Sequence, residues 1–295
     1  MRTALCLSMA VLVSAAPAAL ADLSIDLPTY YLPPDRAALD AANVIEISVT
    51  SDGTDEVSWM RLAAQIGDGG SLNGGTDLRP VIDAVDIVGP GTLFSVDNDG
   101  QMLLLSQPLM QIADVATSTP QAGEDPVIEI TGAAVIADLT IDTTGTAPND
   151  LYPLLLSQVG SNLDGGPPEG INTHFGRTGV GELVTSINDG WLRITYPGDA
   201  TLDGAVNLSD VQALADNWGT TTGANWFKAD FNGDGAVNLS DVQLLGDNWG
   251  KIAGPGPPAP PAAVFAVPEP SSVILAVLGL LGILLLLRRR FARSD

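Results

Sequence analysis

The sequence predicts a mainly β protein, in which an antiparallel β-sandwich is followed by a small α-helical module and a C-terminal transmembrane helix. Three observations predict this order. Residues 22–197 alternate apolar and polar side chains with period two, as half-buried strands do. Residues 198–250 hold a duplicated segment with apolar residues at helical spacing. Residues 271–287 carry no charged side chain.

Composition excludes several classes of protein. The 295 residues include 35 Asp and Glu against 12 Lys and Arg, a formal net charge of −23. A chain this acidic repels phosphate backbones, so no nucleic acid partner is expected. The only cysteine, Cys6, excludes a disulfide framework, a cysteine-rich zinc site and an iron–sulfur cluster.

Residues 1–21 have the pattern of a secretory signal peptide. Arg2 supplies a positive start, and residues 4–13 form a short apolar run. Residues 19–21 (Ala-Leu-Ala) then give a small-x-small cleavage site. We therefore expect the protein to be exported.

Residues 22–197 are expected to fold as the antiparallel β-sandwich. Clusters of Gly, Asp, Asn and Pro separate short segments that alternate with period two. In one of them Ile45, Ile47 and Val49 alternate with Glu46 and Ser48. The predicted strands are 23–27, 44–49, 58–65, 92–96, 101–105, 127–131, 134–141, 151–156 and 182–195.

No catalytic constellation is visible in the sequence, so we expect a protein that is not an enzyme. The only histidine is His174, and no nucleophile-elbow motif accompanies it. Paired carboxylates support glycoside hydrolysis, but with 35 acidic residues a pair somewhere carries almost no information. Most of the acids are expected to form a solvated surface.

The strongest internal signal is a repeat at an offset of 31 residues. Residues 199–219 read DATLDGAVNLSDVQALADNWG, and residues 230–250 read DFNGDGAVNLSDVQLLGDNWG. The two segments are identical at 16 of 21 positions. Duplication on this scale indicates one structural unit used twice.

Each unit opens with a loop whose oxygen-bearing residues alternate as in a calcium-binding loop. Gly204 and Gly235 stand at position 6, where the chain turns sharply. Hard oxygen ligands at this spacing favour calcium over zinc, and over magnesium with its smaller octahedral site. We expect about two calcium ions, one in each loop. The predicted ligands, at positions 1, 3, 5, 7, 9 and 12, are Asp199, Thr201, Asp203, Ala205, Asn207 and Asp210 in the first loop and Asp230, Asn232, Asp234, Ala236, Asn238 and Asp241 in the second, each alanine through its carbonyl oxygen.

The first loop should bind calcium more weakly than the second, because Thr201 offers a hydroxyl where Asn232 offers an amide oxygen.

A helix is expected after each loop, and none is visible before either loop, which argues against an ordinary pair of EF-hands. Apolar residues at i, i+3, i+4 and i+7 predict one buried stripe on each helix. They are Val211, Leu214, Ala215 and Trp218, and then Val242, Leu245, Gly246 and Trp249.

The repeat resembles a type I dockerin, a duplicated calcium-loop–helix module. The resemblance covers residues 198–250 and implies calcium binding, a cohesin domain as partner and a place in complexes that degrade polysaccharides. Positions 10 and 11, which often contribute to partner choice in that family, are Leu208-Ser209 and Leu239-Ser240. The leucines depart from the small polar pair of cellulosomal dockerins, so calcium binding carries over but a cellulosomal partner does not.

Two segments of the predicted sandwich, residues 43–67 and 135–145, resemble cohesin-like sandwiches. The resemblance implies a cohesin-like or jelly-roll arrangement of the strands. It also implies that the dockerin-like module of one molecule binds the sandwich of the next.

The C-terminal segments have the composition of a spacer and a membrane-sorting tail. Residues 251–266 are rich in Pro, Gly and Ala, which favours an extended linker. The apolar residues 271–287 would span roughly 25 Å as a helix, the short limit for a bilayer. Flanking this helix are Val267, Pro268, Glu269 and Pro270 before it and Arg288, Arg289 and Arg290 after it.

These features of residues 267–295 together resemble the PEP-CTERM sorting signal. That resemblance implies processing by an exosortase-type protease of the cell envelope. By the positive-inside rule, the arginine cluster should stay cytoplasmic. An ordinary tail anchor is the alternative.

The sequence thus predicts an exported calcium-binding protein of the cell envelope or surface, anchored at least transiently by its C-terminal helix. Its expected role is adhesion or protein assembly through the dockerin-like module, with a cohesin-like partner in trans or in a second copy. The alternative is an accessory or carbohydrate-binding subunit in polysaccharide degradation, associated with glycoside hydrolases.

Overall fold

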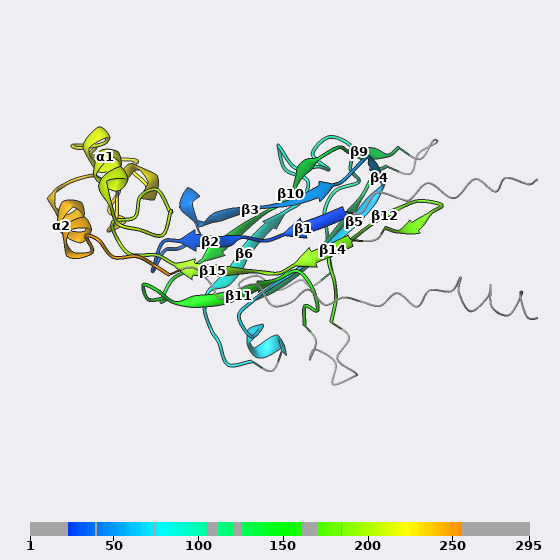
Figure 1. Cartoon of the computed structure of the whole chain (residues 1–295), viewed down its shortest axis with the longest axis horizontal. Helices are drawn as coiled ribbons and strands as arrows, with labels where there is room; N and C mark the ends of the chain where they lie inside the picture. The colour runs from blue at the N-terminus through cyan, green and yellow to red at the C-terminus, as the bar shows by residue number, and fades with distance from the viewer. Residues whose placement is uncertain are drawn as a thin grey trace, which may run out of the picture. The chain divides into compact units, whose positions relative to one another are not determined.

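The computed structural model describes residues 23–38, 40–73, 75–104, 111–120, 126–160, 170–183 and 185–254 (Figure 1). The predicted signal peptide, the sorting motif and the predicted transmembrane helix lie outside the described residues, as do residues 255–266 of the predicted linker. None of the described helices is long and apolar enough to cross a membrane. All described residues belong to one compact unit, Met1–Ala262.

Two β-sheets form the β-domain, which we define as the described residues from 23 to 195. In order across sheet A, the five strands are β14 (Thr185–Asn188), β1 (Leu23–Asp26), β3 (Val44–Ser51), β10 (Ala133–Asp142) and β6 (Val81–Asp86). Across sheet B they are β13 (Gly181–Glu182), β12 (His174–Arg177), β5 (Trp59–Ile66), β11 (Leu151–Leu155), β15 (Gly190–Ile194) and β2 (Thr29–Leu32). Sheet B also includes β8 (Ile112–Ser118), which pairs with β5 and β7 (Met102–Leu103). A separate ribbon pairs β4 (Asp55–Val57) with β9 (Ile128–Ile130).

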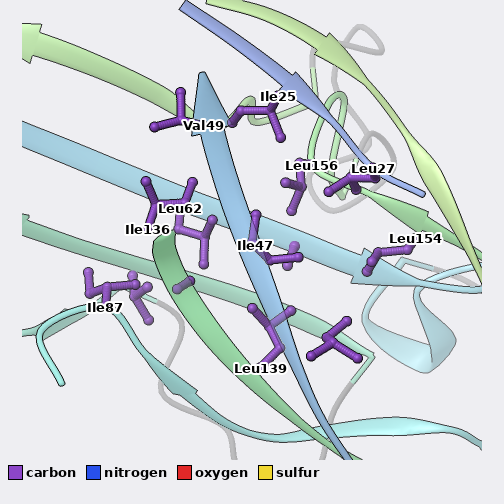
Figure 2. Close-up of a cluster of buried hydrophobic side chains, with 14 of the residues drawn as sticks. Ile25, Leu27, Ile47, Val49, Leu62, Ile87, Ile136, Leu139, Leu154 and Leu156 are labelled. Atoms are coloured by element: carbon purple, nitrogen blue, oxygen red, sulfur yellow. The ribbon is translucent and has the colours of Figure 1, made fainter. Parts of the chain in front are cut away.

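One apolar core lies between the sheets. Alternate residues of β3, Ile45, Ile47 and Val49, are buried in it. Figure 2 shows Ile47 of sheet A in the same cluster as Leu62 and Leu154 of sheet B. The period-two alternation predicts the inner face of this strand correctly, because successive side chains of a strand point to opposite faces.

The sandwich is not purely antiparallel, and that part of the prediction is wrong. β1 pairs with β14 and β2 pairs with β15, both in parallel. The segment from β1 to β2 and the segment from β14 to β15 both cross from sheet A to sheet B, and they lie side by side. Leu27 N donates to Asn188 O at 3.0 Å, and a Cβ on Gly190 would lie 2.5 Å from Pro28 O. Alternation within a strand says nothing about the direction of its neighbour, so the sequence did not reveal these pairs.

Several predicted strands also need correction. Residues 92–96 form turns, because Thr92 Oγ1 donates to the carbonyl oxygens of Ile87 and Gly89 while Phe94 is buried. Residues 182–195 are divided among β13, β14 and β15. The bend between the last two holds Asp189, which accepts main-chain hydrogen bonds from residues 156 and 157. Missing from the prediction were β2, β4, β6, β8 and β12.

Residues 196–254, which we call the module, have a core of their own. Its elements are α1 (Leu208–Asp216), the 3-10 turn η3 (Trp226–Lys228) and α2 (Leu239–Asp247). One residue of the module's core, Ala42, comes from the β-domain, in the 3-10 turn η1 (Ala41–Asn43). The other buried members are Ala200, Val206, Leu214, Trp226, Ala229, Phe231, Val237 and Leu245.

Candidate calcium site

Both helices of the module begin with the same capping arrangement, as expected from the repeat. Ser209 N donates to Asn207 Oδ1 at 2.8 Å, and Asn207 N donates to Asp210 Oδ2 at 2.8 Å. α2 begins with an equivalent capping box on Asn238 and Asp241. Positions 9 and 12 of each predicted loop therefore also fix the start of the helix that follows.

The first and last predicted ligands of both loops are buried carboxylates. The exposed fractions are 0% for Asp199, Asp210 and Asp241 and 2% for Asp230. None of the ion pairs between described residues includes any of the four. Buried charge is costly unless a partner offsets it, so each loop provides two carboxylates that a cation would stabilise.

The position-6 glycines turn each loop around its first aspartate. Gly204 and Gly235 have φ of +85° and +81°, in the left-handed region that favours glycine. Their amides donate to Asp199 Oδ2 and Asp230 Oδ2, each at 2.9 Å. The glycine spacing in the sequence therefore predicts the observed turn.

The electrostatics of the first loop also favour a cation. Burial, together with the negative charges of Asp210 and Asp203, raises the pKa of Asp199 to about 6. Hydrogen bonds from Thr195 and Gly204 act in the opposite direction and lower it. Burial and the neighbouring carboxylates thus disfavour the ionised form of Asp199, which a nearby cation would favour.

The remaining predicted side-chain ligands lie at the open side of each loop. Asn207 Nδ2 donates to Asp203 Oδ2 at 3.3 Å, and Asn238 Nδ2 makes the same bond to Asp234 Oδ2 at 3.3 Å. In the second loop Asn232 Nδ2 also donates to Asp234 Oδ2, at 3.0 Å. Side chains from positions 3, 5 and 9 thus meet in the second loop, and those from positions 5 and 9 meet in the first.

Carboxylates alone do not complete either loop. Within the described part of the chain, no three acidic, histidine or cysteine side chains converge as a metal-binding group. An ion here would also need the side-chain oxygens of positions 3 or 9, an amide oxygen in each case except the hydroxyl of Thr201, and the carbonyl oxygens of Ala205 and Ala236. This mixed set of hard oxygens fits calcium, which accepts six to eight such ligands in flexible geometry.

Each loop is held by the segment that follows the other helix. Val206 N donates to Lys251 O at 3.0 Å, and Gly250 N donates to Val206 O at 2.9 Å. In the same way Val237 N donates to Thr220 O at 2.8 Å. The two units therefore complete each other.

The predicted apolar stripes are mostly wrong: only two of their eight residues are buried, and Ala215, Val242 and Gly246 are exposed as well as both tryptophans. Leu214 and Leu245 are buried, but Trp218 and Trp249 are 55% and 54% exposed. The reason is that the helices end at Asp216 and Asp247, so both tryptophans follow the last helical turn. At the other end, the N-terminal leucines of the two helices are 73% (Leu208) and 74% (Leu239) exposed.

Comparison with family models agrees with this geometry. Residues 197–247 match the model of the type I dockerin domain. Domains of this family generally bind calcium, and the matched range of the dockerin module includes both loops and both helices. A second match, to the PEP-CTERM protein-sorting motif, covers residues 266–290. No curated protein matches the chain.

Solved structures that resemble the chain are cohesin modules. The sixth cohesin of scaffoldin B from Acetivibrio cellulolyticus, solved with a dockerin, is 14% identical with a TM-score of 0.35, over 59% of this chain and 99% of that one. The seventh type I cohesin from Pseudobacteroides cellulosolvens is 8% identical with a TM-score of 0.36, over 60% and 92%. A non-cellulosomal cohesin from Archaeoglobus fulgidus is 9% identical with a TM-score of 0.33, over 62% and 96%. The cohesin-like resemblance of the β-domain is weak at these scores.

A separate pocket of about 520 Å³ opens on sheet B. His174 is one of its lining residues, and its ring meets the indole of Trp59 edge to face, with centroids 5.4 Å apart. Beside them, Arg61 forms a bidentate ion pair with the buried Asp114, at 2.8 and 2.6 Å. The sequence analysis did not find this pocket, because its residues come from four strands or loops far apart in the chain.

Proposed function

We propose that this protein is exported to the cell surface and assembles there, with calcium, through its dockerin module. Calcium would be held in the first loop by Asp199, Thr201, Asp203, Ala205, Asn207 and Asp210 and in the second by Asp230, Asn232, Asp234, Ala236, Asn238 and Asp241. When bound, the ions would supply the positive charge that the four buried carboxylates lack. The PEP-CTERM match supports export and processing by an exosortase-type protease.

The observation that carries the proposal is the duplicated apolar surface of the module. Leu208 and Leu239 are about three quarters exposed at equivalent positions, and Trp218 and Trp249 are about half exposed. The repetition of large exposed apolar side chains at the same positions of both units favours a role for them in binding a partner. The partner we propose is a cohesin-type β-sandwich, in another protein or in a second copy of this chain.

The experiment uses residues 22–262, which contain every described element. Sedimentation velocity with calcium and with a chelator tests association between copies. In parallel, the immobilised protein is exposed to envelope extract of the source cells, and captured proteins are identified. Calcium-dependent dimers or chains, or capture of a protein with a cohesin-type sandwich, is expected. If the protein in calcium neither associates with itself nor captures such a protein, the proposal is contradicted.

The pocket on sheet B supports a second candidate function, the binding of a glycan. Trp59 and Met102 offer apolar surface against sugar C–H groups, and Asp99, Gln101 and Arg61 offer donors and acceptors for hydroxyl groups. A glycan array probed with residues 22–262 tests this candidate, with Trp59→Ala as the matched negative control. Release of reducing sugar tests the glycosidase alternative. Null results in both assays would contradict any role in polysaccharide binding or breakdown.

A further inference from the structure

The two calcium loops meet at one buried tryptophan. Trp226 is 0% exposed, and its Nε1 donates to the main-chain oxygen of Asp199, at position 1 of the first loop, over 2.6 Å. Its ring meets Phe231, at position 2 of the second loop, edge to face with centroids 5.3 Å apart. Trp226 therefore contacts the start of both loops.

The second loop receives an equivalent hydrogen bond from the β-domain. Arg36 Nη2 donates to the main-chain oxygen of Asp230, at position 1, over 2.6 Å. The same guanidinium lies over the Trp226 ring, 5.1 Å from its centroid. Arg36 thus does for the second loop what the indole of Trp226 does for the first, although it comes from the other domain.

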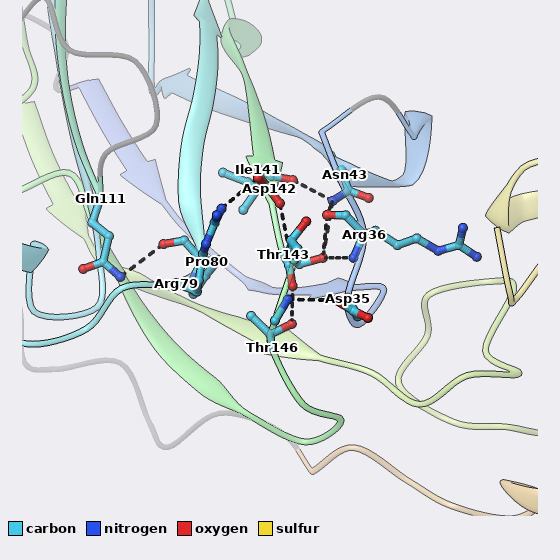
Figure 3. A network of polar contacts seen from close by, with 12 residues as sticks. Asp35, Arg36, Asn43, Arg79, Pro80, Gln111, Ile141, Asp142, Thr143 and Thr146 are labelled. Carbon is cyan, nitrogen blue, oxygen red and sulfur yellow. Dashed lines mark hydrogen bonds and ion pairs between the residues drawn. The ribbon is translucent and has the colours of Figure 1, made fainter.

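The backbone of Arg36 is fixed before its side chain reaches the module. Arg36 N donates to Thr143 Oγ1 at 3.1 Å, and Thr143 N donates back to Arg36 O at 2.8 Å. The buried Asn43 joins this network by donating to Ile141 O at 2.6 Å. Figure 3 shows the guanidinium extending away from the network. The β-domain therefore presents Arg36 from a backbone that is hydrogen-bonded on both sides.

Further contacts from the β-domain reach the first loop. The buried Thr195 Oγ1 donates to Asp199 Oδ2 at 2.5 Å. The ring of Tyr31 packs against Gly204, where an added Cβ would lie 2.5 Å from Tyr31 Cε1. Both loops are thus supported by the β-domain, each at its position-1 aspartate.

We infer that the β-domain and the dockerin module form one calcium-dependent unit, in which ion binding by the loops and closure of the Arg36–Trp226 junction stabilise each other. This inference rests on the calcium binding of the proposed function and adds the β-domain as a participant in it. A loop ordered by calcium fixes the Asp230 carbonyl that Arg36 needs, and by linkage the closed junction favours the ion-binding form of the loop equally. Calcium would then also set the position from which the module presents its helices to a partner.

The test is amide hydrogen exchange, followed residue by residue by NMR, on residues 22–262 with calcium and with a chelator. Two sets of amides are compared. Gly204 and Gly235 report on the loops, and Arg36, Ala42 and Asn43 report on the β-domain side of the junction. Calcium is expected to slow exchange in both sets, by about fivefold or more at the junction. In Arg36→Met, calcium should still slow exchange of the loop amides but should leave the exchange rates of the junction amides nearly unchanged.

The matched control is Arg177→Met, because Arg177 forms its ion pair with Glu56 within the β-domain. This variant should behave as the wild type. Two results would overturn the inference and leave the proposed function standing. One is that calcium slows exchange at the loops of the wild type but not at the junction. The other is that calcium slows the junction amides of Arg36→Met as much as those of the wild type. No slowing at the loops in wild type would overturn calcium binding itself, and the inference with it.

Discussion

The indole nitrogen of Trp226 and the main-chain oxygen of Asp199 are joined by a hydrogen bond of 2.6 Å inside the module. The bond connects the turn before the second loop to the first residue of the first loop, across 27 residues of chain. A buried carbonyl that loses its donor is destabilising, because water cannot replace the bond. This tryptophan therefore contributes to the structural connection between the loops, beside the main-chain bonds that hold each loop to the segment after the other helix.

Trp226→Phe should lower the free energy of unfolding by about 1–3 kcal/mol and weaken calcium binding at the first loop. The phenylalanine keeps an apolar ring but removes the N–H group. The measurement is urea unfolding of residues 22–262 with and without calcium, together with calorimetric titration. The control is Trp191→Phe, because Trp191 Nε1 is buried without a hydrogen-bond partner. Equal calcium affinity in both variants would contradict the prediction.

The two loops should differ in calcium affinity because of position 3. Thr201 Oγ1 donates to Asp210 Oδ1 at 3.1 Å, so the hydroxyl occupies a carboxylate oxygen that an ion would use. Thr201→Asn should therefore tighten the first site by about threefold to tenfold, and Asn232→Thr should weaken the second by a similar factor. Calorimetric titration measures both. If Thr201→Asn leaves the calcium affinity of the first site unchanged, position 3 does not set the difference in affinity between the loops.

The exposed leucines of the module should be needed for assembly but not for calcium binding. The double variant Leu208→Gln, Leu239→Gln removes apolar surface without changing net charge, and partner binding should weaken at least about tenfold. Calcium affinity should stay the same, since neither side chain lies in a loop interior. Leu78→Gln is the matched control, because Leu78 is 81% exposed in the β-domain. Sedimentation and capture assays of the kind described above give the readout, and unimpaired assembly of the double variant would count against this surface.

Stability should fall at alkaline pH because of Tyr30, which packs partly buried against the core of the β-domain. Burial, with a smaller contribution from Glu46, raises the pKa of Tyr30 to about 12 from 10.0. Between these values the folded chain holds a proton that the unfolded chain has lost, so the stabilisation is complete below pH 10 and is lost as pH rises through about 12. Urea midpoints at increasing pH measure the slope, and Tyr30→Phe should reduce it. The remaining slope is expected from Tyr152, whose pKa is also raised to about 12.

Most of the candidate site could be predicted from the repeat in the sequence. Gly204 and Gly235 could be placed at the turn of each loop because their spacing from the flanking aspartates is fixed along the chain. The capped helix starts were not predicted, although the three-residue spacing of Asn207 and Asp210 is a local pattern that could have indicated them. The exposed Trp218 was misassigned because the helical periodicity continues two residues beyond the end of α1.

The sequence by itself determined that the chain is mainly β, that a duplicated loop–helix module follows, and which residues line each loop. These features depend on period, spacing and identity over fewer than about twenty neighbouring residues, where backbone geometry fixes the outcome. Only the tertiary structure decided the parallel pairs, the pocket around Trp59 and the contact of Arg36 with Asp230. Arg36 and Asp230 are 194 positions apart. Which distant side chains meet follows from how whole elements pack, and no local pattern in the sequence encodes it.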